Sequence, residues 1–215
     1  MSFTLATLKT AIGDYLESDE TTFTNNLNRF IQESEDRIYS LVELTEQRKI
    51  VSATLTASNR FLACPSDFLA PLSLAVITTN TYDYLDLKHN SFIREYAPTV
   101  TSTGKPKYYS IFSQTSFSLA PVPDANYSVE LGYLHRPASL TVGADSGTSV
   151  LATDFPDALL YGSLVEAAIF LKEENDVVSN LEGRFKEAVA RMKNTSEARV
   201  TSDEYRSDSL VRPKT

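Results

Sequence analysis

The feature that most constrains this chain is a change in the spacing of its apolar residues, which is helical at both ends and alternating in the middle. Leu5, Leu8 and Ile12 recur every three to four positions, which places them on one face of a helix. The same spacing returns after Pro156. Between these regions, short runs of β-branched and aromatic residues are separated by Pro, Asn and Asp. This order favours an antiparallel sandwich or barrel between helices and argues against repeated βαβ units.

Local signals place the ends of several predicted elements. Pro156 suits the first position of a helix, with Asp154 as its cap. Asn90 or Ser91 would cap one or two helical turns in the middle of the chain. Helices are predicted at 5–16, 23–42, 156–171 and from 176 to about 195, and strands at 48–56, 61–64, 72–77, 82–87, 107–112, 116–119, 127–135 and 148–151.

The predicted fold class is α+β, a bundle of N- and C-terminal helices with an inserted antiparallel β-sandwich or barrel domain. Residues 1–46 and 154–195 form the predicted helical bundle domain, and residues 47–153 form the inserted β domain. The helical pattern fades near Thr195. Residues 196–215 are therefore expected to form an extended polar tail.

The composition excludes several classes of protein. The chain has 20 Lys and Arg against 28 Asp and Glu, a net charge of −8, which argues against a basic nucleic-acid binder. One Cys and two His exclude a disulfide framework and leave little for a metal site. The sequence shows no secretory signal and no apolar run of about 18 residues. We therefore expect no metal, no membrane partner and assembly in a reducing cytoplasm.

The chain also lacks the signatures of common catalytic and cofactor sites. There is no Gly-x-Ser-x-Gly elbow and no glycine-rich phosphate loop. A catalytic interpretation would use His89 or His135 as general base, with Asp83 or Asp86 as its orienting partner. Nothing in the spacing selects that pairing, and loop histidines are the plainer interpretation. We predict a protein that is not an enzyme, with no catalytic residues and no cofactor.

Two further groups of residues have competing interpretations. The aromatic residues of the β region could form a stacking platform, but core and cross-strand packing is the more common arrangement. Acidic clusters are usually solvated helix faces or helix starts, and the alternative is a negative surface that repels DNA. The residues of the first group are Tyr82, Tyr84, Tyr96, Tyr108, Tyr109, Phe112, Phe117 and Tyr127, and those of the DNA-repelling surface are Glu33, Glu35, Asp36, Glu173 and Glu174.

A series of weak motifs in a fixed order resembles a known family. The motifs are Leu5-x-x-Leu8-x-x-x-Ile12-x-x-x-Leu16, the stretch 23–32, Pro65-Ser66-Asp67-Phe68-Leu69, Gly104-x-Pro106-x-Tyr108-Tyr109, Leu119-x-Pro121-x-Pro123, Tyr127-x-Val129-Glu130-Leu131-x-Tyr133, the stretch 155–167, and Phe185-x-x-Ala188. Together they resemble the head-to-tail adaptor proteins of short-tailed bacteriophages, over most of residues 1–195.

The resemblance implies a virion structural protein. Its relatives form a ring, typically of twelve copies, between the portal and the tail nozzle, and DNA passes through the lumen without sequence-specific contact. Their helical bundle carries much of the ring contact. Their C-terminal segment reaches the portal or a neighbouring subunit. A carbohydrate- or receptor-binding β module of a phage tail is the alternative. The docking residues expected here are Arg199, Tyr205, Arg206, Leu210, Val211 and Arg212.

Overall fold

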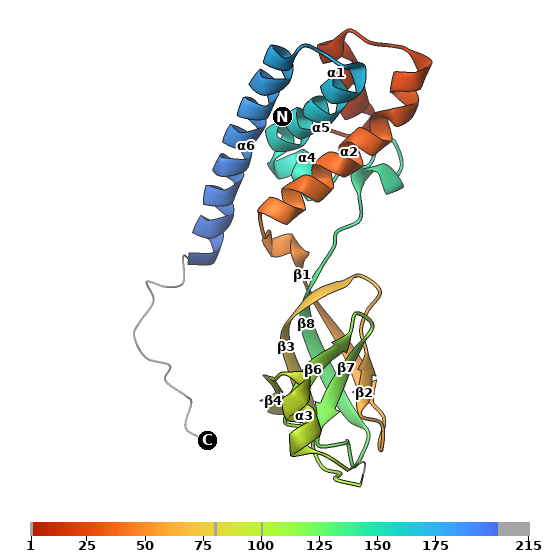
Figure 1. Cartoon of the computed structure of the whole chain (residues 1–215), viewed down its shortest axis with the longest axis vertical. Helices are drawn as coiled ribbons and strands as arrows, with labels where there is room; N and C mark the ends of the chain where they lie inside the picture. Colours follow the sequence, from red (N-terminus) through yellow and green to blue (C-terminus); the bar gives the residue numbers. More distant parts are fainter. Residues whose placement is uncertain (1, 80, 100, 202–215) are drawn as a thin grey trace. The chain divides into compact units, whose positions relative to one another are not determined.

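The computed structural model describes residues 2–79, 81–99 and 101–201 (Figure 1). The chain divides into two compact units. Residues 1–45 and 138–215 form the helical unit, and residues 46–137 form the β unit. Helices and two sheets occur together, which confirms the predicted α+β class. The second boundary differs from the predicted one, because residues 138–153 belong to the helical unit.

The helical unit is built around one buried helix. Helix α5 has nine buried residues and packs against four other helices, α1, α2, α4 and α6. Small residues such as Gly162 and Ala167 allow this close packing. The elements are α1 (Leu5–Leu16), α2 (Thr21–Leu41), the 3-10 turn η2 (Leu140–Val142), α4 (Val150–Asp154), α5 (Pro156–Leu171) and α6 (Asn175–Thr201).

Three local expectations in the helical unit are wrong. Residues 148–151 do not form a strand, because the Ser149 hydroxyl accepts the amide hydrogen of Ala152 at 3.2 Å and caps α4. Phe155 occupies the cap position of α5 in place of Asp154, while Pro156 is in the first turn as predicted. Helix α6 continues to Thr201, so residues 196–201 are helical and not an extended tail.

Ser196 explains why α6 continues past the point where its apolar pattern fades. Its side chain is buried, with 6% exposure, and its hydroxyl donates to the carbonyl of Glu43 at 2.8 Å. A polar residue thus fixes this turn of the helix to the end of α2. A hydrophobic pattern carries no signal for such a contact.

The β unit is a sandwich of two four-stranded sheets, which Figure 1 shows as facing layers. Sheet A has the strand order β1-β8-β3-β4, and sheet B has the order β2-β7-β6-β5. The chain enters this unit through the turn η1 (Thr45–Gln47). The strands are β1 (Arg48–Leu55), β2 (Phe61–Ala63), β3 (Phe68–Thr78), β4 (Thr81–Tyr84), β5 (Asp86–Leu87), β6 (Tyr108–Ser113), β7 (Ser116–Ala120) and β8 (Tyr127–His135).

The core of the sandwich lies between the two sheets. Inward residues of sheet A, such as Leu74 and Val129, pack against Phe117 and Leu119 of sheet B. Helix α3 (Asn90–Tyr96) lies against β6 and β7. Its cap is His89, and not Asn90 or Ser91, because the His89 ring nitrogen accepts the amide hydrogen of Ser91 at 3.3 Å. All neighbouring strands are antiparallel except β5 and β6, which are parallel.

Candidate interaction surfaces

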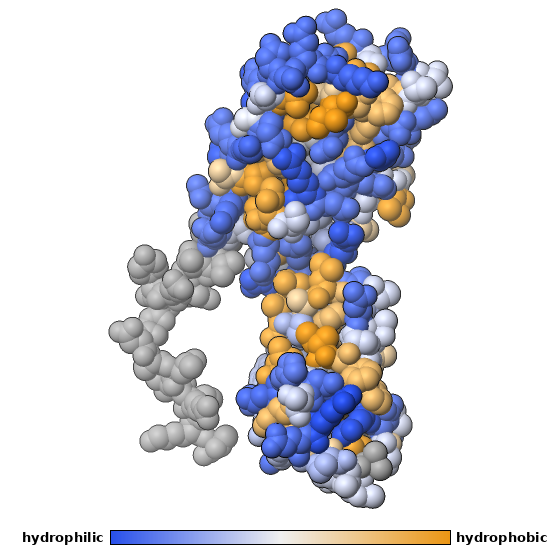
Figure 2. All heavy atoms as spheres, in the orientation of Figure 1, coloured by the Kyte–Doolittle hydropathy of each residue, from blue (hydrophilic) through white to orange (hydrophobic). Residues whose placement is uncertain are grey.

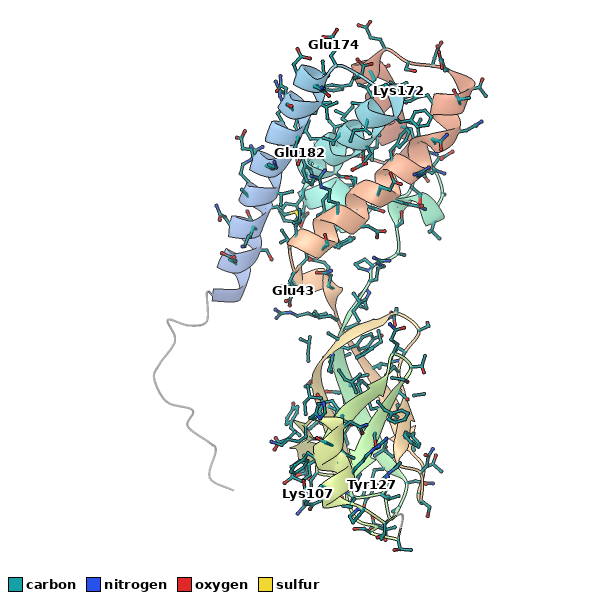
Figure 3. The ribbon with its side chains drawn as sticks, viewed as in Figure 1. Glu43, Lys107, Tyr127, Lys172, Glu174 and Glu182 are labelled. Carbon is teal, nitrogen blue, oxygen red and sulfur yellow. The ribbon has the colours of Figure 1, made fainter. Side chains whose placement is uncertain are left out.

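Four of the five residues of the predicted acidic surface are exposed or half-buried. Asp36 is exposed and Glu33 is half-buried on α2, where Glu33 accepts a hydrogen bond from Arg29 at 2.8 Å. Glu173 and Glu174 are exposed in the turn between α5 and α6, where Figure 3 labels Glu174. These side chains come from two separate places on the helical unit. Among the described residues, no group of three or more potential ligands could hold a metal ion.

Glu35 does not belong to this surface, because its side chain is buried with 3% exposure. One carboxylate oxygen accepts the amide hydrogen of Leu140 at 3.1 Å and so fixes turn η2 against α2. The other oxygen, Oε2, is buried without a hydrogen-bond partner among the described residues. Burial raises the pKa of this carboxyl group. Glu35 is therefore an internal anchor, and its assignment to a DNA-repelling surface is wrong.

A charged network that the sequence did not predict lies inside the helical unit. The Arg37 guanidinium donates to Glu182 at 2.5 Å, lies 3.8 Å from Glu166 and covers the Phe185 ring at 4.5 Å. Burial raises the pKa of Glu166. Burial also acts to raise the pKa of Glu182, but the hydrogen bond and charge of Arg37 hold it below its ordinary value. This network joins α2, α5 and α6 and is structural. Arg37 falls among the solvated positions of its helix in the sequence, so periodicity gave no signal for it.

The two histidines are placed on separate elements of the β unit. His89 caps α3, and His135 ends β8 with its ring 6.5 Å from the Tyr133 ring. The proposed orienting carboxylates have other partners. Asp83 accepts from Lys105 and Thr78, and Asp86 lies 3.8 Å from Lys88. The structure does not bring together the histidine–aspartate pair that a general base would need.

A second polar network gives a role to one of the quoted motifs. Asp67, from the Pro65–Leu69 turn, accepts from the buried Tyr133 hydroxyl at 2.9 Å and from Lys49 at 2.7 Å. The hydrogen bond from Lys49 lowers the pKa of Asp67, and the same contact raises the pKa of Lys49. Burial, together with Asp67, raises the pKa of Tyr133. The motif thus fixes the β3 end of sheet A to β1 and β8.

The eight aromatic residues of the candidate stacking platform are buried, half-buried or exposed, and Tyr108 and Tyr127 are the half-buried ones. Tyr109 and Phe117 are buried in edge-to-face contact at 5.7 Å, as core packing predicts. Tyr82, Tyr84, Tyr96 and Phe112 are exposed. Figure 2 shows hydrophobic residues beside hydrophilic ones on the visible face of the β unit. Core packing therefore accounts for only some of the eight aromatic residues.

The predicted docking residues lie at the end of the described residues or beyond them. Arg199 lies in the last turns of α6. Tyr205, Arg206, Leu210, Val211 and Arg212 lie outside the described residues. Within the described part of the chain, no helix is both long enough and apolar enough to cross a membrane.

The comparison with known families accounts for almost the whole chain. The sequence profile described as SU10 adaptor protein matches residues 3–212. No curated protein matches the chain. The match covers both units and includes the segment after α6. The chain therefore belongs to the SU10 adaptor protein family, and it is a structural adaptor of a bacteriophage virion.

Proposed function

We propose that this adaptor forms a closed ring of about twelve copies that joins the portal to the tail nozzle and lets DNA pass through its lumen. The observation that supports this proposal is the match to the adaptor family. A closed ring requires two different, complementary faces on each copy. In this proposal the ring sits at the head–tail junction of the virion and assembles in the cytoplasm of the host bacterium.

The distribution of charge supports an acidic lumen. The helical unit has 12 Lys and Arg against 21 Asp and Glu, a net charge of −9, whereas the β unit has 8 against 7, a net charge of +1. A ring would multiply the charge of the helical unit and repel the phosphates of passing DNA. Glu33, Asp36, Glu173 and Glu174 are the described residues that we assign to this surface. Contact with DNA would then be weak and independent of sequence.

The C-terminal segment is proposed to dock on the portal or on a neighbouring copy. Tyr205, Leu210 and Val211 would supply apolar contact, while Arg199, Arg206 and Arg212 would pair with acidic groups of the partner. Because Ser196 is bonded to Glu43, the segment to delete is 202–215. We expect this deletion to weaken attachment to the portal while the circular dichroism spectrum keeps its helical and β content. If the deletion variant attaches to the portal as well as the wild type does, the C-terminal segment has no docking role.

Particle mass tests the ring directly. Mass photometry and negative-stain imaging would be applied to the protein alone and mixed with the portal of the same phage. Particles of about twelve copies, free or on the portal, are the expected result. A single-chain mass in both samples would contradict the ring.

A second candidate function is carbohydrate or receptor binding by the β unit. A cavity of about 360 Å³ favours it, because Tyr84 and Tyr108 line the cavity together with Asp83, Asp86 and Lys107. Aromatic faces with a few convergent polar groups are typical of ligand sites. A glycan array probed with the intact protein tests this function. Binding that is lost in Tyr84→Ala, but not in Phe112→Ala, would support it.

A further inference from the structure

The two edges of sheet A have large apolar side chains in solvent. On the edge strand β1, Ile50 is 69% exposed. On the opposite edge strand β4, Tyr82 is 50% and Tyr84 is 68% exposed. The four residues of β4 are all exposed. Leu69 and Leu72 of the central strand β3 are also exposed, so the apolar surface of this sheet includes its two edge strands but is not limited to them.

Beyond Lys49, strand β1 lacks the usual protection of an edge strand. Natural edges are blunted by charge, proline, bulges or short length. The eight residues of β1 pair with β8 in one continuous register without a bulge. After Lys49 the strand contains no charged residue and no proline. Within the described residues, β8 is its one partner strand. The edges of sheet B, by contrast, are strands of three and two residues.

The exposed apolar residues of both edges lie on one face of sheet A. Residues directly opposite each other on neighbouring strands share a face. Across the sheet, small or polar residues of β8 and β3 separate the apolar edges, except in the row that contains the half-buried Ile77. The rows are Ile50–Gly132–Ser73, Ser52–Glu130–Ala75–Tyr84 and Thr54–Ser128–Ile77–Tyr82.

The strand directions allow one edge to join the other between copies. Each neighbouring pair in sheet A is antiparallel, so β4 runs opposite to β1. In a head-to-tail ring every copy presents the same orientation to its neighbour. The free edge of β4 in one copy would then meet the free edge of β1 in the next as an antiparallel pair, which continues the pattern of the sheet.

We propose that sheet A forms one of the contacts between neighbouring copies, beside that expected of the helical bundle, with β4 of one copy added to β1 of the next. This inference rests on the proposed ring and names one of its contacts. In this register Tyr84 lies opposite Ile50 and Tyr82 opposite Ser52. Aromatic and β-branched residues are favourable cross-strand pairs.

Cysteine cross-linking tests this register. Cys64 is the one cysteine of the chain, and Cys64→Ser provides the background. In that background, Ile50→Cys and Tyr84→Cys are combined in the full-length protein and oxidised after assembly with the portal. Within one copy these residues lie on opposite edges of sheet A and cannot bond. We expect a ladder of covalent multimers on a non-reducing gel.

The matched control combines Ile50→Cys with Ile111→Cys, because Ile111 is also exposed on the β unit but lies in sheet B. This pair should give no ladder. If the unmodified protein forms rings but the 50/84 pair gives no more multimers than the control, the sheet contact is overturned and the ring stands. If the unmodified protein forms no ring, alone or with the portal, the proposed function fails and the contact with it.

A charge at the β1 edge gives an independent test. Ile50→Lys adds the protection that natural edges have. We expect it to weaken each contact about fivefold, so that rings dissociate at higher protein concentration than the wild type. Val142→Lys, at a position 76% exposed in the helical unit, is the control. Thermal unfolding of both variants should match the wild type, because neither residue is in a core. Wild-type assembly of Ile50→Lys would contradict the proposal.

Discussion

At the scale of single residues, Glu35 is the most informative side chain of the helical unit. Its pKa in the folded protein is raised above the ordinary value of 4.5, because the carboxyl group is buried with one oxygen unpartnered. Between these two pKa values the folded state binds more protons than the unfolded state. The free energy of unfolding should therefore fall as pH rises through this window, and the loss persists at neutral pH.

The variant Glu35→Gln should be more stable than the wild type at pH 7, by about 1 kcal/mol. The amide keeps an acceptor for Leu140 and removes the buried charge. Urea denaturation between pH 4.5 and pH 8 measures both effects, and the variant should show a flatter dependence on pH. Glu174→Gln, which removes a carboxylate at an exposed position in the turn before α6, is the control. A variant that is less stable at every pH would contradict this account.

The Tyr133 hydroxyl is the corresponding residue-scale test in the β unit. It is the buried donor to Asp67, so Tyr133→Phe should lower the free energy of unfolding by about 1 kcal/mol. Tyr127 offers a matched control, because its hydroxyl donates to the exposed Asp124 at 2.7 Å. Tyr127→Phe should cost only a few tenths of that amount, since water replaces an exposed partner. Equal losses in chemical denaturation would show that the Asp67 network does not stabilise the sheet.

At the scale of elements, two glycines separate helix packing from helix propensity. A Cβ at Gly162 in α5 would overlap the Ser34 hydroxyl of α2 and come within 3.0 Å of the Phe185 ring of α6. A Cβ at Gly183 in α6 would meet nothing within 4 Å. Gly162→Ala should therefore destabilise by about 1–3 kcal/mol, whereas Gly183→Ala should stabilise by up to about 1 kcal/mol. Thermal unfolding of both variants would test the close approach, and opposite signs are the expected outcome.

The elements with a strong apolar period could be predicted from the sequence, and those with polar determinants could not. Helices α1 and α2 follow their apolar spacing closely, whereas α5 is apolar on most of its surface and its start is given by Pro156. The failures are the residues 148–151, the cap at His89 and the continuation of α6 past Thr195. Each depends on a side-chain hydrogen bond made by Ser149, His89 or Ser196. Such bonds depend on partners that the local sequence does not specify.

At the scale of the whole molecule, the order of helical and β regions could be predicted, but the surfaces could not. Glu33, Glu35 and Asp36 look alike in sequence, yet Glu35 faces the interior. Likewise, eight aromatic residues of the β region look alike, and only the pairing of strands shows that Tyr82 and Tyr84 lie on a free edge. Alternation gives the face of a strand and not its place in the sheet order. The proposed contact between copies depends on the strand order of sheet A, which the sequence does not specify.

Because the chain divides into two units, we predict that the β unit folds by itself. Its core shares no residue with the core of the helical unit. Its ends lie on adjacent strands, because Arg48 is paired with Leu134. A fragment of residues 46–137 should therefore unfold cooperatively, within about 5 °C of the β-sheet transition in the full chain. Circular dichroism and dispersed amide resonances would measure this. A fragment with a random-coil spectrum would show that the helical unit is required for the sandwich to form.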